Sequence, residues 1–362
     1  MTMMSNLPRD LLEEILSRAP ADSMRAIRLT CKKWNTLTEE ESFRKKQLLL
    51  AKAAKEFMVV MLMNSMVCLV SINLHKEDDF IKCNGKLINL TDVSQVFHCG
   101  GLVCITNGFT NTRDVLWNPY WGQTRWIDAR SRHAYIYAIG YETKKSCRSY
   151  KIVSSANYYI DDKRVDYEIY ELDSNSWRVL DLNSDWATAF YKMEVSVKGN
   201  SYTYTRAGGR GEFLLCFDFT TEGFRPALPL PFHSHRQDIV ALSSVREEQL
   251  AVLYQRYDTL HMEIWITSKI EPNDVSWRKL LLAVDMKPLT VCYGNFFVDE
   301  EKKVAVVFDK DKEIRHRNTA YIIGENGYLR KVDLGESQSF LVGCSYVPSS
   351  VQIKQLAKGK SN

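Results

Sequence analysis

Three polar patterns bring side chains close enough in the sequence to suggest chemistry. His233 and His235 could bind a metal from a loop, but no adjacent cysteine or carboxylate completes a site. The glycine-rich stretch 208–211 would surround a phosphate only between a strand and a helix, and both of its flanks are strand-like. Asp161–Asp162 and Asp309–Asp311 are typical of turns, not of paired catalytic acids. The sequence therefore predicts no catalytic residue, no metal site and no cofactor.

The cysteines are scattered and form no Cys-x-x-Cys pair. Most lie in apolar, strand-like runs, where a free thiol behaves as a small hydrophobic side chain. Their odd number and wide spacing favour a reducing compartment, the cytoplasm or the nucleus. The nine residues are Cys31, Cys68, Cys83, Cys99, Cys104, Cys147, Cys216, Cys292 and Cys344.

Composition and charge exclude several classes of protein. The 362 residues are 45% hydrophobic and 25% charged, which is ordinary for a globular chain. A net charge of +4 gives no argument for nucleic acid or an anionic membrane as partner. Charged residues in the first 20 positions argue against a signal peptide, and the apolar stretch 57–72 is short for a membrane span. We expect no nucleic-acid and no membrane partner.

The N-terminal 48 residues have helical spacing. Pro8 favours a first helical turn, and apolar residues from Leu11 to Leu16 recur with the period of a helix. A second helix follows Pro20 and carries apolar residues through Trp34 and Leu37. Phe43 begins a third helix. The sequence therefore predicts a small all-α module of three helices, too small to bury all of its apolar residues alone.

The residues after Glu56 have the texture of strands separated by polar turns. A loose repeat places an aromatic residue on a strand about every 50 residues, which is a spacing of kelch-like β-propellers. The stretch 80–90 resembles the same hairpin in a degenerate first unit, and the strand 340–347 could close the ring. The pattern predicts an all-β domain that is a six-bladed kelch-like β-propeller; the alternative is two β-sandwich domains. The repeated aromatic positions are Trp126, Trp177, Phe224, Trp277 and Tyr328.

The N-terminal module resembles an F-box, as found in substrate receptors of cullin-RING ubiquitin ligases. Three positions depart from the usual pattern: Ala19 and Met24 stand where leucine is common, and Thr38 where isoleucine is common. Ala19 could weaken a contact with the adaptor. The residues that carry the resemblance are Leu7, Pro8, Asp10, Leu11, Glu14, Ile15, Leu16, Pro20, Ser23, Arg28, Cys31, Lys32, Trp34 and Phe43.

The rest of the chain resembles the F-box-associated domain of large plant protein families. The resemblance implies an F-box at 1–48, a linker or helix end at 49–56, the β-domain at 57–350 and a flexible tail at 351–362. The resemblance rests on the segments 100–104 (GGLVC), 116–119 (LWNP), 138–141 (AIGY), 150–153 (YKIV), 170–178 (YELDSNSWR) and 199–202 (GNSY).

The resemblance implies a non-catalytic substrate receptor. The F-box would bind a Skp adaptor, and through it a cullin-RING ligase, while the β-domain would hold an unknown target protein for ubiquitination. Alternatives are a ligand- or glycan-binding propeller with a vestigial F-box, and a propeller enzyme, which the lack of an acid–base pair disfavours. The expected adaptor-binding residues are Leu7, Pro8, Leu11, Ile15, Leu16, Leu29, Cys31 and Trp34.

Segments between the predicted blades should lie on one face of the propeller. Three of these segments carry aromatic, histidine or arginine residues, and recognition residues concentrate in loops on a rigid scaffold. We therefore expect this face to bind the target; the alternative is a solvated set of loops. The candidate residues are Arg130, Arg132, His133, Trp186, Phe232, His233, His235 and Arg236.

Overall fold

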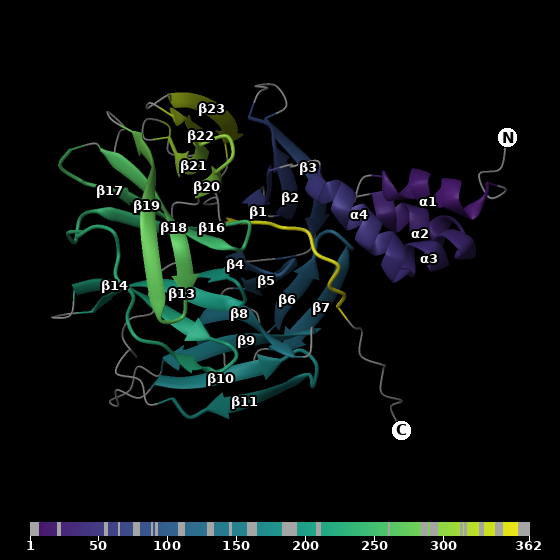
Figure 1. Ribbon diagram of the computed structural model, residues 1–362, viewed down its shortest axis with the longest axis horizontal. Helices are drawn as coiled ribbons and strands as arrows, with labels where there is room; N and C mark the ends of the chain where they lie inside the picture. Colours follow the sequence, from purple (N-terminus) through teal and green to yellow (C-terminus); the bar gives the residue numbers. More distant parts are fainter. Residues whose placement is uncertain are drawn as a thin grey trace.

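The structure is a computed structural model in which a helical module lies beside a ring of β-sheets (Figure 1). It describes residues 7–19, 23–53, 57–63, 66–74, 80–87, 90, 93–107, 113–128, 134–144, 147–157, 165–182, 194–207, 211–259, 261–283, 289, 296–311, 314, 317–325, 329–336 and 343–353.

The described part of the helical module has four helices where the sequence predicts three. They are α1 (Arg9–Ser17), α2 (Met24–Thr30), α3 (Lys32–Glu39) and α4 (Glu41–Ala53). The predicted second helix is interrupted at Cys31, whose backbone is extended (φ −160°, ψ 160°), so α2 ends there and α3 begins. The apolar spacing continues across this break, which explains why the spacing alone does not reveal it.

Six four-stranded antiparallel sheets form the β-domain, which confirms the predicted six-bladed propeller. Blades are numbered along the chain, and their strands are given from one edge of the sheet to the other. Blade 1 contains β24 (Gly343–Ser345), β1 (Phe57–Met63), β2 (Met66–Ile72) and β3 (Ile81–Leu87). Blade 2 contains β4 (Val93–Cys99), β5 (Leu102–Asn107), β6 (Arg113–Asn118) and β7 (Gln123–Asp128). Blade 3 contains β8 (Ala134–Lys144), β9 (Cys147–Asn157), β10 (Val165–Glu171) and β11 (Ser176–Leu180).

The other three blades repeat this order. Blade 4 contains β12 (Glu194–Val197), β13 (Asn200–Ala207), β14 (Gly211–Asp218) and β15 (Gly223–Phe224). Blade 5 contains β16 (Ile239–Val245), β17 (Gln249–Gln255), β18 (Met262–Glu271) and β19 (Asp274–Ala283). Blade 6 contains β20 (Phe296–Asp299), β21 (Val304–Lys310), β22 (Arg317–Ile323) and β23 (Leu329–Glu336).

The ring is closed by its last described strand. β24 pairs antiparallel with β1, with Cys344 opposite Val60, so both ends of the β-domain contribute to blade 1. This pairing confirms the closure predicted for the strand 340–347. The stretch 80–90, however, was predicted to be a hairpin and is not one. Asn84 is an extra residue inside β3, because Cys83 pairs with Val70 and Gly85 with Leu69, which makes a β-bulge.

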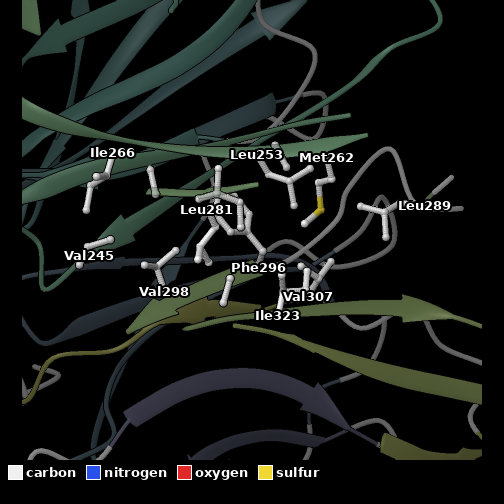
Figure 2. Close-up of a cluster of buried hydrophobic side chains, with 14 residues drawn as sticks. Val245, Leu253, Met262, Ile266, Leu281, Leu289, Phe296, Val298, Val307 and Ile323 are labelled. Atoms are coloured by element: carbon white, nitrogen blue, oxygen red, sulfur yellow. The ribbon is translucent and has the colours of Figure 1, made fainter. Parts of the chain in front are cut away.

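Each pair of neighbouring blades shares a cluster of buried apolar side chains. Figure 2 shows the cluster between blades 5 and 6, in which Leu253 and Met262 face Phe296 and Val307. Because a blade is covered on both sides, its middle strands bury both of their faces and appear in the sequence as continuous apolar runs. An example is β2, which has four consecutive buried residues.

The repeated aromatic residues with described placements lie on the outer strands, and Trp177, Phe224 and Trp277 contact residues of the preceding blade or of the segment that follows it. Trp126, Trp177, Phe224 and Trp277 belong to β7, β11, β15 and β19, and Tyr328 lies outside the described residues. The indole of Trp177 donates to the carbonyl oxygen of Asp128 (3.1 Å), and the indole of Trp277 donates to that of Pro229 (3.0 Å).

The arginine that follows two of these tryptophans binds the next blade. Arg178 forms an ion pair with Glu222, and Arg278 forms one with Glu300. The tryptophan–arginine pair thus holds a blade to both neighbours, which gives a physical reason for its recurrence in the sequence.

The antiparallel blades define two faces of the propeller. The turns between first and second strands lie on the face to which α4 leads, here called the helix-side face. The segments between blades lie on the opposite face, here called the far face. The C-terminal segment 346–353 follows β24 on the helix-side face, where Tyr346 donates from its backbone to Met58 (3.0 Å) (Figure 1). The predicted flexible tail starts at residue 351, whereas Ile353 is buried, so the packed chain extends at least to that residue.

Candidate functional site

The helical module has a small interior of its own. One side of α1 buries Leu12 and Leu16, which are four residues apart and therefore on the same face of the helix. They pack with Met24 from α2, Leu37 from α3 and Phe43 from α4. The module thus folds around one side of α1 and leaves the other side outside.

Large apolar side chains remain exposed on the outer side. Leu11 and Ile15 are 54% and 44% exposed and are also four residues apart on α1. Leu29 on α2 is 80% exposed. Pro8, which precedes α1, is exposed, and Leu7 is half-buried. Leu11 and Ile15 therefore form an exposed apolar pair on α1, and an exposed apolar patch can mark a surface that binds another molecule.

The remaining expected adaptor residues lie deeper in the module. Leu16 is 3% exposed and belongs to the interior. Cys31 is half-buried at the break between α2 and α3, and Trp34 is half-buried against the interior cluster. The structure therefore separates the eight residues into an exposed group around Leu11, Ile15 and Leu29 and a group that supports it from within.

The three departures from the usual pattern are interior positions. Met24 and Thr38 are buried, and the Thr38 hydroxyl donates to the carbonyl oxygen of Asn35 (2.9 Å). Ala19 packs against the interior cluster, and its carbonyl oxygen accepts a hydrogen bond from Gln47 (3.4 Å). These substitutions change the packing of the module beneath the exposed apolar surface.

The module is held on the propeller by two aromatic residues of blade 2. The Tyr120 hydroxyl donates to the carbonyl oxygen of Gln47 in α4 (3.1 Å). The Arg28 guanidinium lies 5.3 Å from the centre of the Trp121 ring and donates to the Trp121 carbonyl oxygen (3.3 Å). Burial in this contact lowers the pKa of Arg28, with smaller effects from Glu39 and Arg44.

The turn that carries these aromatic residues also binds the C-terminal segment. The Asn118 side-chain oxygen accepts the backbone N–H groups of Tyr120 and Trp121 (3.1 and 3.2 Å). Its amide donates to the carbonyl oxygen of Val351 (2.7 Å), and the Trp121 indole donates to that of Ser349 (2.9 Å). The LWNP sequence noted above therefore ends in a joint between both modules, a role that its sequence does not show.

On the far face, one predicted target-binding segment is well described. His233, His235 and Arg236 are exposed, and the Phe232 ring stacks on the Tyr254 ring with centroids 4.1 Å apart. Arg206 donates to the carbonyl oxygens of His235 (2.8 Å) and Arg236 (3.2 Å) and so fixes the backbone beneath the exposed side chains.

Asp238 fixes the other end of this segment. Its carboxylate accepts the His235 N–H (2.7 Å) and the Tyr254 hydroxyl (3.0 Å). Burial acts to raise the pKa of Asp238, but hydrogen bonds from His235, Tyr257 and Tyr254 outweigh it and lower that pKa. The remaining predicted target-binding residues, Arg130, Arg132, His133 and Trp186, lie outside the described residues.

Two further kinds of site are absent from the described ranges. There, no group of three or more histidine, cysteine, aspartate or glutamate side chains could hold a metal ion. In the same ranges, no helix has both the length and the apolar composition needed to cross a bilayer. All eight cysteines with described placements are free thiols.

Comparisons with known proteins match both modules. Residues 4–46 match the F-box domain, and residues 58–353 match the F-box associated beta propeller domain. A putative F-box/kelch-repeat protein of Arabidopsis thaliana is 74% identical, over 100% of both chains. An F-box/kelch-repeat protein of the same plant is 51% identical, over 98% of this chain and 100% of its own.

A solved structure supports the fold alone. TolB from Acinetobacter baumannii superposes with a TM-score of 0.51 at 10% identity, over 85% of this chain and 73% of its own. The two sequence matches, the helical module with its exposed apolar side and the six-bladed ring agree with one another: the chain belongs to the F-box proteins that carry an F-box associated β-propeller domain.

Proposed function

We propose that this protein is the substrate-recognition subunit of an SCF-type cullin-RING ubiquitin ligase. Its F-box binds a Skp adaptor, and its propeller holds the target protein. The observation that carries the proposal is the exposed apolar pair Leu11 and Ile15 on α1, together with the exposed Leu29 on α2, in a module whose interior is filled by other residues.

Adaptor binding would bury the apolar side chains that the module alone leaves exposed to water. Burying one leucine or isoleucine side chain stabilises a complex by about 1.5–3 kcal/mol before entropy costs. In our proposal Leu7 and Pro8 extend the contact at the start of α1. Leu16, Cys31 and Trp34 contribute by holding α1 and α2 in position. The affinity for the adaptor is therefore expected to depend most on the exposed residues of α1 and α2.

The chain itself need not perform covalent chemistry in this role. Its relatives carry names of F-box and kelch-repeat proteins, not of enzymes. A receptor accelerates ubiquitin transfer by raising the effective concentration of the target near the charged enzyme of the ligase. The cysteines with described placements are free thiols, which fit a reducing compartment, and the proposed location is the cytoplasm or the nucleus.

The target would bind on the far face, away from the adaptor. The fixed segment with Phe232, His233, His235 and Arg236 forms the described part of this surface, and Arg130, Arg132, His133 and Trp186 belong to the same set of segments. Rigid backbone below exposed side chains reduces the entropy lost on binding. In this proposal, target and adaptor bind at opposite ends of the molecule.

Adaptor binding can be tested with the full-length chain and an immobilised Skp adaptor from Arabidopsis thaliana. Leu11→Asp with Ile15→Asp should abolish capture, because two charges would enter an apolar contact. Leu282→Asp is the matched control, since Leu282 is 46% exposed on β19 of the propeller. Capture that survives the double substitution, or fails for the unaltered chain, contradicts the proposal.

Target capture is tested separately. Proteins that copurify with the tagged chain under proteasome inhibition are compared with those of a chain lacking residues 1–56. Trp186→Ala with Arg236→Ala should then reduce target recovery without changing adaptor recovery. Lys269→Ala, at an exposed site on the other face, serves as control. Undiminished target recovery from the double variant would rule out the far face as the binding surface.

A further inference from the structure

A pocket of about 760 Å³ opens on the helix-side face, opposite the proposed target surface. Its walls come from the first turns of blades 3, 4 and 5, from the C-terminal segment 347–353 and from Leu48 of α4. The volume lies within the range of about 300–1,000 Å³ that is usual for small-molecule sites. Nothing in the proposed receptor role uses this pocket.

One wall of the pocket is held rigidly. The C-terminal segment has no regular secondary structure, but hydrogen bonds from Trp121 to Ser349 and from Asn118 to Val351 fix it. Its backbone at Ile353 also donates to the Gln123 side chain (3.0 Å). The half-buried Val347 and Val351 therefore offer a preformed apolar surface, so that ligand binding does not lose entropy by ordering this segment.

An arginine from blade 3, Arg148, lines the same pocket. The Arg148 guanidinium lies 4.3 Å from the centre of the Tyr141 ring, which orients its plane. Among the residues that the structure describes, no carboxylate forms an ion pair with it. A planar guanidinium held in this way can bind a carboxylate or a phosphate with two parallel hydrogen bonds.

The other charged residues of the pocket lining are Arg125, Asp173, Lys198, Arg246, Glu247 and Glu248. Burial acts to lower the pKa of Arg148, but Tyr150, Tyr141 and Glu247 outweigh it and raise that pKa, so the guanidinium stays charged. Glu247 turns its carboxylate to the Gly100 N–H and lies 3.2 Å from His98 Nδ1. Asp173 accepts the Ser149 hydroxyl (2.9 Å). Lys198 and Arg246 add two further cations at the rim of the pocket.

Both rim cations are paired with exposed acids. Lys198 lies 3.1 Å from Glu271 and Arg246 lies 2.9 Å from Glu301. Surface pairs of this kind contribute little stability, so an anionic ligand can compete for Lys198 and Arg246.

We propose that this pocket binds an organic anion, in which one carboxylate or phosphate group is held by Arg148 and an apolar body packs on Val347 and Val351. The inference is independent of adaptor binding and of the target surface. It requires only the folded propeller with its C-terminal segment in place.

Titration calorimetry on the full-length chain tests the proposal with four probes: phenyl phosphate, benzoate, inorganic phosphate and benzyl alcohol. Phenyl phosphate or benzoate should bind at one site and at least about tenfold more tightly than inorganic phosphate and benzyl alcohol. Comparing the two aromatic anions shows whether phosphate or carboxylate is preferred. If neither binds saturably, or if inorganic phosphate binds equally well, the proposal is wrong.

Arg148→Gln should weaken the binding of the preferred probe by about tenfold or more. Arg256→Gln is the matched control, because Arg256 is an exposed arginine at the end of β17 on the far face. Equal losses of affinity in both variants would mean that the probe is attracted non-specifically by positive charge, which would contradict the proposal. If Arg148→Gln fails to fold, Val351→Ser tests the apolar wall instead. This variant should weaken the binding of phenyl phosphate but not that of inorganic phosphate.

A second measurement locates the bound probe. Cys147 lines the pocket and its side chain is exposed, whereas the exposed Cys83 lies on β3 of blade 1, away from the pocket. A saturating concentration of the preferred probe should slow alkylation of Cys147 by iodoacetamide and leave the rate at Cys83 unchanged. Equal rates at Cys147 with and without the probe would place binding elsewhere and overturn the proposal.

Discussion

The indole Nε1 of Trp121 donates a 2.9 Å hydrogen bond to the carbonyl oxygen of Ser349, 228 positions further along the chain. Trp121 also lies beneath Arg28 of the F-box. A single buried side chain of blade 2 therefore connects the F-box, the propeller and the C-terminal segment.

Trp121→Phe should destabilise the C-terminal segment. The variant keeps most of the ring but leaves the Ser349 carbonyl oxygen without its donor, which costs about 1–3 kcal/mol. Hydrogen exchange of residues 347–353 should accelerate, while exchange in blade 5 stays unchanged. Trp126→Phe is the control, because Trp126 is 51% exposed. Equal acceleration in both variants would contradict the role given to Trp121.

Arg28→Met should loosen the F-box from the propeller without unfolding either. It removes the hydrogen bond to Trp121 and the guanidinium above the ring, while the apolar stem of residue 28 is retained. We expect faster tryptic cleavage after Lys52 or Lys55 and an unchanged melting temperature of the propeller. Lys45→Met provides a control on the exposed side of α4. Unchanged cleavage would show that other contacts hold the joint.

Gly140→Ala should be strongly destabilising, by about 1–3 kcal/mol or more. Gly140 belongs to the AIGY sequence on β8, and an added Cβ would meet the Phe219 ring and lie 2.5 Å from the Gly199 carbonyl oxygen. Gly85→Ala is the control, because its nearest neighbour would be at 3.8 Å. Urea denaturation of both variants measures the difference, and equal midpoints would exclude this close approach.

Glu194→Gln should stabilise the protein increasingly as the pH rises. The Glu194 Oε2 atom is buried without a hydrogen-bond partner in the described structure, and burial raises the pKa of this carboxyl well above its ordinary value of 4.5. The folded protein therefore keeps a proton that the unfolded chain loses above about pH 4.5, so wild-type stability falls as the pH rises from there to the folded pKa.

The substitution removes this loss because glutamine does not ionise. Urea unfolding at several pH values should show no difference between variant and wild type near pH 4 and a growing difference above it. The slope is at most about 1.4 kcal/mol per pH unit. Glu325→Gln, an exposed site in blade 6, is the control. A difference that does not change with pH would contradict the prediction.

The sequence predicts features that repeat and misses those that do not. Trp177 and Trp277 mark outer strands because each donates the same kind of indole hydrogen bond to the segment before its blade. The closing strand was also predictable, since a ring of blades leaves one position unfilled. In contrast, Asn84-Gly85 is a typical hairpin turn in sequence but forms a bulge, because pairing with β2 continues on both sides of it.

Contacts between distant segments were not predictable. Nothing near Arg28 in the sequence indicates Trp121, and the segment 346–353 has no periodicity that would separate it from a tail. The exposed group on the F-box was predicted only as part of a larger set, because helical spacing alone does not tell which side of α1 faces the interior. Burial of Leu12 and Leu16 decides that question.

The pairing of β24 with β1 has a consequence for folding during synthesis on the ribosome. β1 is synthesised before the other five blades, and β24 is synthesised after them. One edge of β1 therefore has no strand to pair with while the other five blades are made. Open strand edges pair readily with other chains. The nascent propeller therefore exposes an unpaired edge of β1 until residues 343–345 are made, and a chain that stops before residue 343 lacks the strand that pairs with that edge.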